Sequence, residues 1–210
     1  MAENKEQMNF SIFEQPVKVI PTFVEKENTG KPYINYGVDN RFPNYLWDLY
    51  MRSALLQSIV NGTADYANGN GITYAENANI QRLAEEANKD GETLEDIIKK
   101  ITVDYLVFGG FAFQIIYNKL DEVNEIYWLD FRNVRRSKDG DKIYYSDDWI
   151  KHSNDFITYD IFNPEKKKGS QVFYFKGHIS RGIYPVPRYN GALSAIETST
   201  EISKFHLNSI

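Results

Sequence analysis

The sequence predicts an α+β fold: helices come first, an antiparallel β-rich region follows, and a long helix begins near the C-terminal end. Up to Gly110, apolar residues recur with the helical period of 3.6. After Gly110 the period changes to two, which is typical of strands. The third observation is composition. Hydrophobic residues make up 42% of the 210 residues, with 15 Tyr and 13 Phe, so a folded chain is expected rather than a disordered one.

Residues 1–35 are predicted to form an extended arm. Pro16 and Pro21 would break a helix in this segment. The run from Asn28 to Pro32 is a cluster of turn-forming residues. A weak alternation of apolar and polar residues over Gln15 to Val24 also allows a short strand or a docking segment.

Residues 36–110 are predicted to be mainly helical. After an irregular linker, Asn44 is expected to be the N-cap of a short helix that begins at Tyr45. Ser53 is the expected N-cap of a second helix. This second helix should end at the glycine-containing segment 68–71, because glycine readily adopts the positive φ of a helix end.

Two further helices are expected before Gly110. The first covers residues 77–87. The second begins at a capping box formed by Thr93 and Asp96, with Asp in place of the preferred Glu. Its apolar residues share one face, and Gly109 and Gly110 end it. Those apolar residues are Leu94, Ile97, Ile98, Ile101 and Tyr105.

Residues 111–187 are predicted to be rich in β-strands. The segment Lys138–Asp141 reads as a hairpin turn, and we expect antiparallel pairing. The expected strands are 111–117, 125–129, 142–145, 155–161 and 171–176.

Residues 188–210 are predicted to begin a long helix near Ala192. Leu193, Ile196, Ile202 and Phe205 are expected to form one apolar stripe. The last residues carry neither a glycine C-cap nor a proline, so the helix is expected to continue in a longer protein. The stripe would then pack on another copy or fray, and this chain would be a monomer or a small oligomer.

Composition limits the classes of function. The absence of cysteine excludes disulfides, thiol catalysis and sulfur-ligated zinc, and it suits a reducing cytosol. Neither a signal peptide nor a membrane span is expected. The net charge is −5 and the isoelectric point is about 5.3. We therefore interpret the two basic runs, Arg132 to Lys138 and Lys166 to Lys168, as solvated loops rather than as a nucleic-acid grip.

No residue is expected to be catalytic, to bind a cofactor or to bind a metal. His152, His178 and His206 are far apart in the sequence, without metal-ligand spacing. Neither a phosphate-binding loop nor a nucleophile elbow is present. Asp130 is the carboxylate of most interest, and we expect it to pair at a turn with one of the nearby arginines, Arg132, Arg135 or Arg136, rather than to act in catalysis. The protein is therefore expected not to be an enzyme.

Five segments, taken in order, resemble the portal proteins of tailed bacteriophages. Tyr36–Pro43 is similar to the segment that opens many portals. Ser58–Ile72 resembles their helix with a glycine stop, and Tyr105–Ala112 their helix-to-strand passage. Ile126–Arg135 is similar to a strand of the family. Tyr184–Ile196 resembles the tract before a long central helix.

The resemblance covers residues 36–210 and implies a structural role. Portals are rings, usually dodecamers, at one capsid vertex in the virion, and they assemble in the bacterial cytoplasm. The implied partners are other copies of the chain, the large terminase subunit, and capsid and neck or adaptor proteins. Double-stranded DNA would pass through the channel without sequence-specific contact. Residues 36–110 would correspond to the wing, 111–187 to the clip or wing, and 188–210 to the start of the stem.

Two alternatives remain open at this point. An aromatic-rich module that binds sugar or peptide would show a concave, exposed cluster of aromatic side chains. A metal-dependent nuclease would need at least three carboxylates and a lysine that converge on one point.

Overall fold

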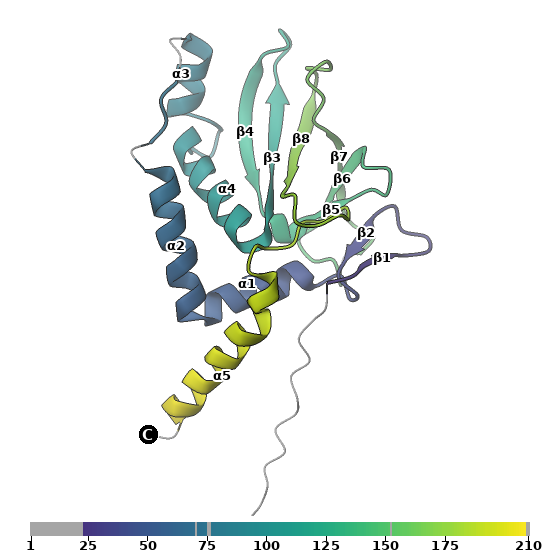
Figure 1. Cartoon of the computed structure of the whole chain (residues 1–210). Coiled ribbons are helices and arrows are strands. Elements are labelled where there is room, and N and C mark those ends of the chain that lie inside the picture. Colours follow the sequence, from purple (N-terminus) through teal and green to yellow (C-terminus); the bar gives the residue numbers. More distant parts are fainter. Residues whose placement is uncertain (1–22, 70, 75–76, 152, 209–210) are drawn as a thin grey trace, which may run out of the picture.

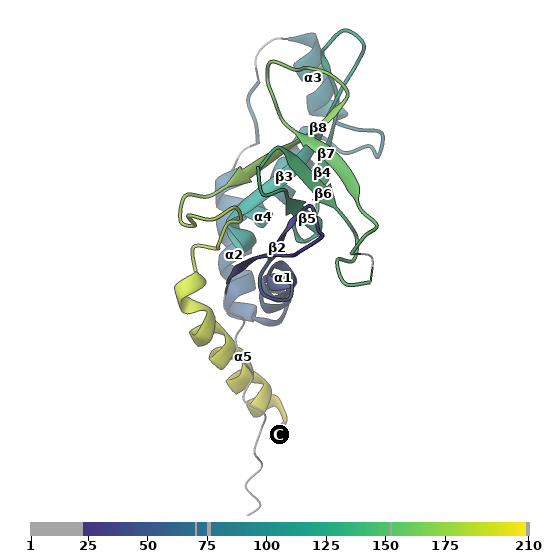
Figure 2. The same cartoon turned by 90° about the vertical axis from the view of Figure 1, so that its right-hand side faces the viewer.

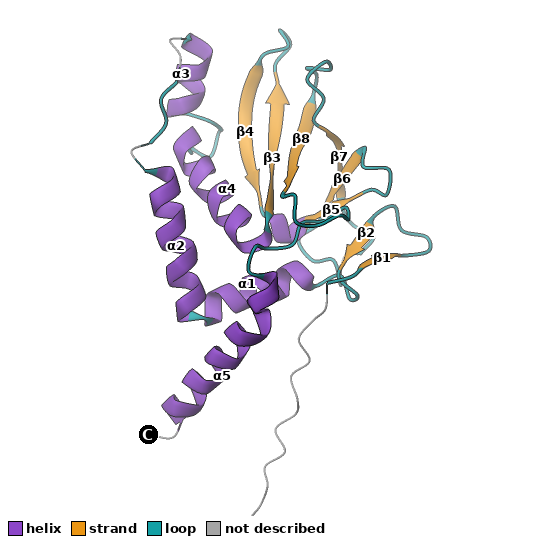
Figure 3. Cartoon of the chain, viewed as in Figure 1, coloured by secondary structure: helices purple, strands orange, loops and turns teal. Residues whose placement is uncertain are grey.

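A six-stranded sheet and the helices beside it form the body of the molecule in the computed structural model (Figure 1). The structure describes residues 23–69, 71–74, 77–151 and 153–208. Figure 3 shows the helices gathered to one side of the sheet and below it. The α+β prediction is confirmed, with four helices before the strands of the large sheet and a long helix at the end.

The predicted helices and strands occur in the predicted order, and β1, β2 and β5 are additional. The helices are α1 (Phe42–Arg52), α2 (Ala54–Asn68), α3 (Ala78–Glu85), α4 (Leu94–Phe108) and α5 (Leu193–Asn208), with 3₁₀ turns η1 (Phe131–Asn133) and η2 (Asn190–Ala192). The strands are β1 (Glu25–Glu27), β2 (Ile34–Tyr36), β3 (Gly110–Tyr117), β4 (Val123–Leu129), β5 (Val134–Arg136), β6 (Lys142–Tyr145), β7 (Ile157–Ile161) and β8 (Ser170–Lys176).

The large sheet has the strand order β4-β3-β8-β7-β6-β5. Its strand pairs are antiparallel, as predicted, except for β7 and β8, which are parallel over Asp160–Gln171 and Ile161–Val172. The buried Gln171 amide holds the loop that joins these two strands. It accepts a hydrogen bond from the Asn163 backbone N–H and donates one to the Lys166 carbonyl. The connecting loop is therefore held against the start of β8, and the chain enters β8 in the direction in which it left β7.

The end of the predicted arm is folded. β1 and β2 form an antiparallel hairpin, and the side chains of Tyr33, Ile34 and Tyr36 are buried. Residues 1–22, which include most of the candidate strand 15–24, lie outside the described part of the chain. The prediction of an extended arm through residue 35 is therefore wrong for the hairpin, because its aromatic side chains pack into the core.

Two of the three predicted N-caps are confirmed. The Leu56 N–H donates to the Ser53 hydroxyl over 3.3 Å, and Thr93 and Asp96 form the full capping box. The Asn44 prediction is wrong, because α1 begins at Phe42 with Arg41 at the N-cap. Pro43 accounts for the earlier start, since the fixed φ of proline suits the first helical turn.

Helix α3 ends two residues before the predicted end because the following residues bind the edge of the sheet. The Ile126 N–H donates to the Ala87 carbonyl over 2.8 Å, and the Asn88 amide donates to the Ile126 carbonyl over 3.0 Å. These bonds occupy the outer edge of β4. An exposed edge strand would otherwise offer unpaired backbone groups to another chain.

One hydrophobic core spans the predicted divisions at residues 36, 110 and 187. It contains residues from β2, α1, α2, α4, the large sheet and the first turn of α5. The largest of its fully buried apolar members are Tyr36, Tyr184, Phe42, Phe108 and Phe131. The change at residue 110 is thus a change of secondary structure within one packed body.

Helix α5 leaves that body after its first turns, as Figures 1 and 2 both show. Leu193 is 6% exposed, whereas Ile202 and Phe205 are 52% and 66% exposed. Nine residues separate Leu193 from Ile202, which is two and a half turns at 3.6 residues per turn. The two side chains therefore lie on opposite sides of the helix, and the prediction of one apolar stripe is wrong.

Candidate assembly surface

The outer face of α2 is apolar and exposed. Leu55, Ile59 and Tyr66 are 58%, 57% and 89% exposed, and their spacing puts them on one side of the helix. Asp65 is the only charged residue among the 15 of α2, although charged residues make up 25% of the chain. A helix that faces water normally carries charges on that side. Exposed apolar patches of this kind are typical of protein–protein contacts.

A groove of about 520 Å³ runs between α2 and the start of α5. Leu106 of α4 contributes to its lining, and Arg188 and Tyr189 approach it from the segment before α5. Most of the apolar side chains along it belong to two helices. They are Leu55, Leu56, Ile59 and Val60 from α2, and Ala195 and Ile196 from α5.

The tract that leads into α5 is anchored by tyrosines. The ring of Tyr36 stacks on that of Tyr184 at 4.3 Å, and the Tyr36 hydroxyl donates to the Pro185 carbonyl over 2.5 Å. The Tyr184 hydroxyl donates in return to the Ile34 carbonyl. Complete burial raises the pKa of both phenols, so both remain donors at neutral pH. These contacts fix the tract that leads into α5 to the β2 strand.

Two glycines allow the same tract to cross the junction between α4 and β3. Gly109 has φ +82°, and a Cβ atom on it would lie 2.2 Å from the Val186 carbonyl oxygen. A Cβ atom on Gly110 would lie 2.6 Å from the Phe175 carbonyl oxygen. The backbone can approach this closely only where side chains are absent.

Charged residues fix the direction of α5 against α1. Arg52 Nε lies 2.9 Å from Asp48, and its Nη2 lies 3.2 Å from the buried carboxylate of Glu197. Its Nη1 lies 3.8 Å from Glu201. Burial, with Glu197 as a neighbour, raises the pKa of Tyr45 to about 12. A buried carboxylate needs such partners, so the Arg52 contacts favour one orientation of α5.

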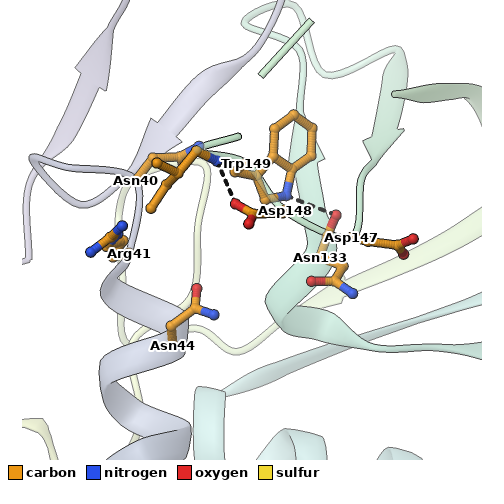
Figure 4. Close-up of a pocket in the computed structure, with 8 residues that line it drawn as sticks. Asn40, Arg41, Asn44, Asn133, Asp147, Asp148 and Trp149 are labelled. Atoms are coloured by element: carbon orange, nitrogen blue, oxygen red, sulfur yellow. Dashed lines mark hydrogen bonds between the residues drawn. The ribbon is translucent and has the colours of Figure 1, made fainter. Parts of the chain in front are cut away.

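A second, polar pocket of about 330 Å³ lies at the start of α1 (Figure 4). Trp149 forms one wall, and its indole N–H donates to the Asn133 carbonyl over 3.0 Å. Asp148 accepts hydrogen bonds from the N–H groups of Ile150 and Lys151, which is the geometry of a turn cap. Trp149 and Asp148 at this pocket therefore use their polar groups to hold the local backbone.

Arg135 is fully buried, and its guanidinium lies 5.1 Å from the centre of the Trp149 ring. Its guanidinium donates to the side-chain and backbone oxygens of Asn40 and to the carbonyls of Arg132 and Val134, over 2.5–2.8 Å. Burial lowers the pKa of Arg135 to about 10. The interpretation of Arg132–Lys138 as a solvated loop is wrong here, because β5 turns Arg135 inward. The Lys166–Lys168 run is exposed in the loop before β8, as predicted.

Asp130, the carboxylate singled out in the sequence, takes part in an ion pair at a turn. Asp130 pairs with Arg132, with Nε at 3.0 Å from both carboxylate oxygens, and it also accepts the Arg132 backbone N–H. The expected turn-holding pair is confirmed. His178 and His206 are exposed, and His152 lies outside the described residues. Within the described ranges, His, Asp and Glu side chains do not form a group of three or more that could hold a metal.

Sequence reasoning missed Asp104. This aspartate is 2% exposed and accepts the Trp128 indole N–H over 2.7 Å. Burial raises the pKa of Asp104 well above its usual value. A signal was present in the sequence, since Asp104 follows Ile97 by seven residues and therefore lies on the same buried helical face.

The described aromatic side chains lie mainly in the core and at its border. The Trp47 ring lines an open pocket, but the Arg132 guanidinium lies 4.8 Å from its centre. This cation occupies a face on which a sugar would otherwise stack.

No helix among the described residues has the length and apolarity required to cross a bilayer.

Comparison with known proteins gives similarity at the level of fold. No known family matches the sequence, and no curated protein matches it. A chain in the "Neck of empty GTA particle computed with C6 symmetry" matches 80% of this chain with a TM-score of 0.60 and 10% identity. A chain in the "Virion of native gene transfer agent (GTA) particle" matches 78% with a TM-score of 0.59 and 12% identity. The matches cover 46% and 44% of those chains, so this chain shares its fold with less than half of each.

Proposed function

We propose that this chain is a structural subunit of the portal ring in a tailed phage or a related particle. The observation that carries the proposal is the fold shared over 80% of the chain with a chain of the gene transfer agent neck. The ordered portal-like segments in residues 36–210 support the same assignment. The apolar α2 face supports it as well, since a ring subunit needs surfaces that bind its neighbours.

In this proposal the protein is part of the virion and assembles in the bacterial cytoplasm. A closed ring, taken as a dodecamer, would form the channel for packaging and ejection of double-stranded DNA. The ring would bind the large terminase subunit during packaging, and capsid and neck or adaptor proteins in the particle. The net charge of −5 suits a channel wall that repels the phosphate backbone.

The proposed role is mechanical and requires no catalytic activity. The structural positions of Asp130 and Asp104 support this, since both carboxylates accept hydrogen bonds that hold local structure. The check is incubation of pure protein with DNA and Mg²⁺. Cleavage that a single carboxylate substitution abolishes would contradict the proposal.

Electron microscopy and light scattering test the ring directly. Protein expressed from the complete reading frame is expected to form closed rings with a central channel. A tagged copy is expected to label one vertex of the particle. A protein that remains monomeric at all concentrations and salt conditions, or that labels every vertex, would disprove the portal role.

A further inference from the structure

We propose that the α2 groove of one copy binds the projecting half of α5, residues 201–208, of a neighbouring copy. This inference rests on the proposed function, because it names two surfaces through which ring subunits would meet. A ring needs a heterologous interface, in which two different surfaces of the same chain bind each other. The α2 groove and the projecting half of α5 are two such surfaces.

The first surface, the α2 groove, leaves apolar side chains exposed in a single copy of the chain. The groove is apolar, and α2 presents a single charge along its length. The first turns of the molecule's own α5 already form one wall, through Ala195 and Ile196. An added helix would therefore lie between two helices already in place, and would extend a helix–helix packing that the fold itself begins.

The second surface is exposed along its whole described length. All side chains from residue 201 to residue 207 are exposed, and Ile202 and Leu207 are 52% and 74% exposed. Both views of the chain show this part of α5 pointing away from the body (Figures 1 and 2). Since α5 is one continuous helix, its second half cannot turn back into the groove that its first half lines.

The two surfaces match in length. The groove follows α2 over nine residues, Leu55 to Thr63, and the projecting half covers eight, residues 201–208. At a rise of 1.5 Å per residue, they span about 12 Å and about 10.5 Å. A second copy is thus a suitable occupant in length, and its exposed Ile202, Phe205 and Leu207 supply apolar side chains for the groove. The structural neighbour in a neck with C6 symmetry indicates that the fold is compatible with a repeating arrangement of copies.

The absence of cysteine makes disulfide cross-linking a direct test. One variant carries Ile59→Cys in the groove, and the other carries Ile202→Cys on the projecting half; both sites are exposed, so folding should be retained. A disulfide requires Cα atoms about 4.4–6.8 Å apart. An oxidised mixture of the two single variants should give a linked pair with one chain of each kind, and the double variant should give a ladder of longer species.

The control replaces the groove cysteine with Leu120→Cys, at the exposed turn between β3 and β4. Its yield of pairs with Ile202→Cys should be several-fold lower. If the protein forms rings but the Ile59–Ile202 pair links no better than the control, the present inference fails and the portal role stands. If the complete protein forms no ring and the two sites do not cross-link, both proposals fail. Linkage of Ile59→Cys chains mainly to each other would indicate a two-fold α2 contact and would also overturn the inference.

Discussion

At the scale of single residues, Arg135 gives the largest expected effect on stability. Its guanidinium satisfies four oxygen acceptors in the core, and Asn40, at φ +62°, depends on it. Arg135→Met should lower the free energy of unfolding by about 3 kcal/mol, because these acceptors stay buried and lose the donors that the guanidinium supplies. Urea unfolding measures this change. The matched control is Arg181→Met at an exposed position, where a change within about 0.5 kcal/mol is expected. Equal effects of the two substitutions would contradict the assigned role.

At the same scale, the raised pKa of Asp104 predicts that the stability of the folded protein depends on pH. Its pKa is raised in the folded protein above the usual value of 3.8, so the folded state holds the proton more tightly than the unfolded state. This contribution is fully present below pH 3.8 and is lost as the pH rises towards the folded-state pKa. Asp104→Asn remains neutral and can still accept the Trp128 N–H. The stability of the variant relative to the natural protein should therefore increase as the pH rises from 3.8 towards 7. A difference that stays constant across urea titrations in this range would refute the prediction.

At the scale of helices and strands, glycine positions offer a matched pair of substitutions. Gly109→Ala should destabilise the fold by more than about 2 kcal/mol, because it combines positive φ with a clash against Val186. Gly62 lies inside α2, where an added Cβ atom would meet nothing within 4 Å. Gly62→Ala should stabilise the protein by about 0.5–1 kcal/mol. Thermal unfolding of both variants gives the comparison, and a destabilised Gly62→Ala protein would show that the helix is packed differently.

Elements with local signals were predictable from the sequence. Ser53 and the Thr93–Asp96 box define helix starts through bonds within one turn, so their residue types are sufficient. The Asn44 prediction failed because a nearby proline offered a competing start. The parallel pairing of β7 with β8 has no local signal in the sequence, and the Gln171 contacts that hold the connecting loop arise only in the folded chain.

The candidate site was less predictable, for a related reason. The sequence predicted a helix here, but the exposure of Leu55 and Ile59 depends on which neighbours the fold supplies. For α5, apolar residues alone predicted a single stripe. Only the folded structure shows that Ile202 is exposed and lies beyond the core. Which apolar side chains remain exposed for assembly thus depends on tertiary packing and on which elements cover each helix.

At the scale of the whole molecule, charged substitutions on the α2 face should abolish assembly without unfolding the protein. Leu55→Glu combined with Ile59→Glu places two charges on an exposed surface, so the free energy of unfolding should change by no more than about 1 kcal/mol. Self-association should nevertheless be lost, because an apolar interface would have to bury unpaired carboxylates. The matched control is Ile157→Glu on β7, 56% exposed, which should leave association unchanged. Light scattering over a range of concentrations measures the mass, and urea unfolding checks the fold. If the double variant still assembles like the control, α2 is not a contact surface, and a portal ring built from this chain must close through other surfaces.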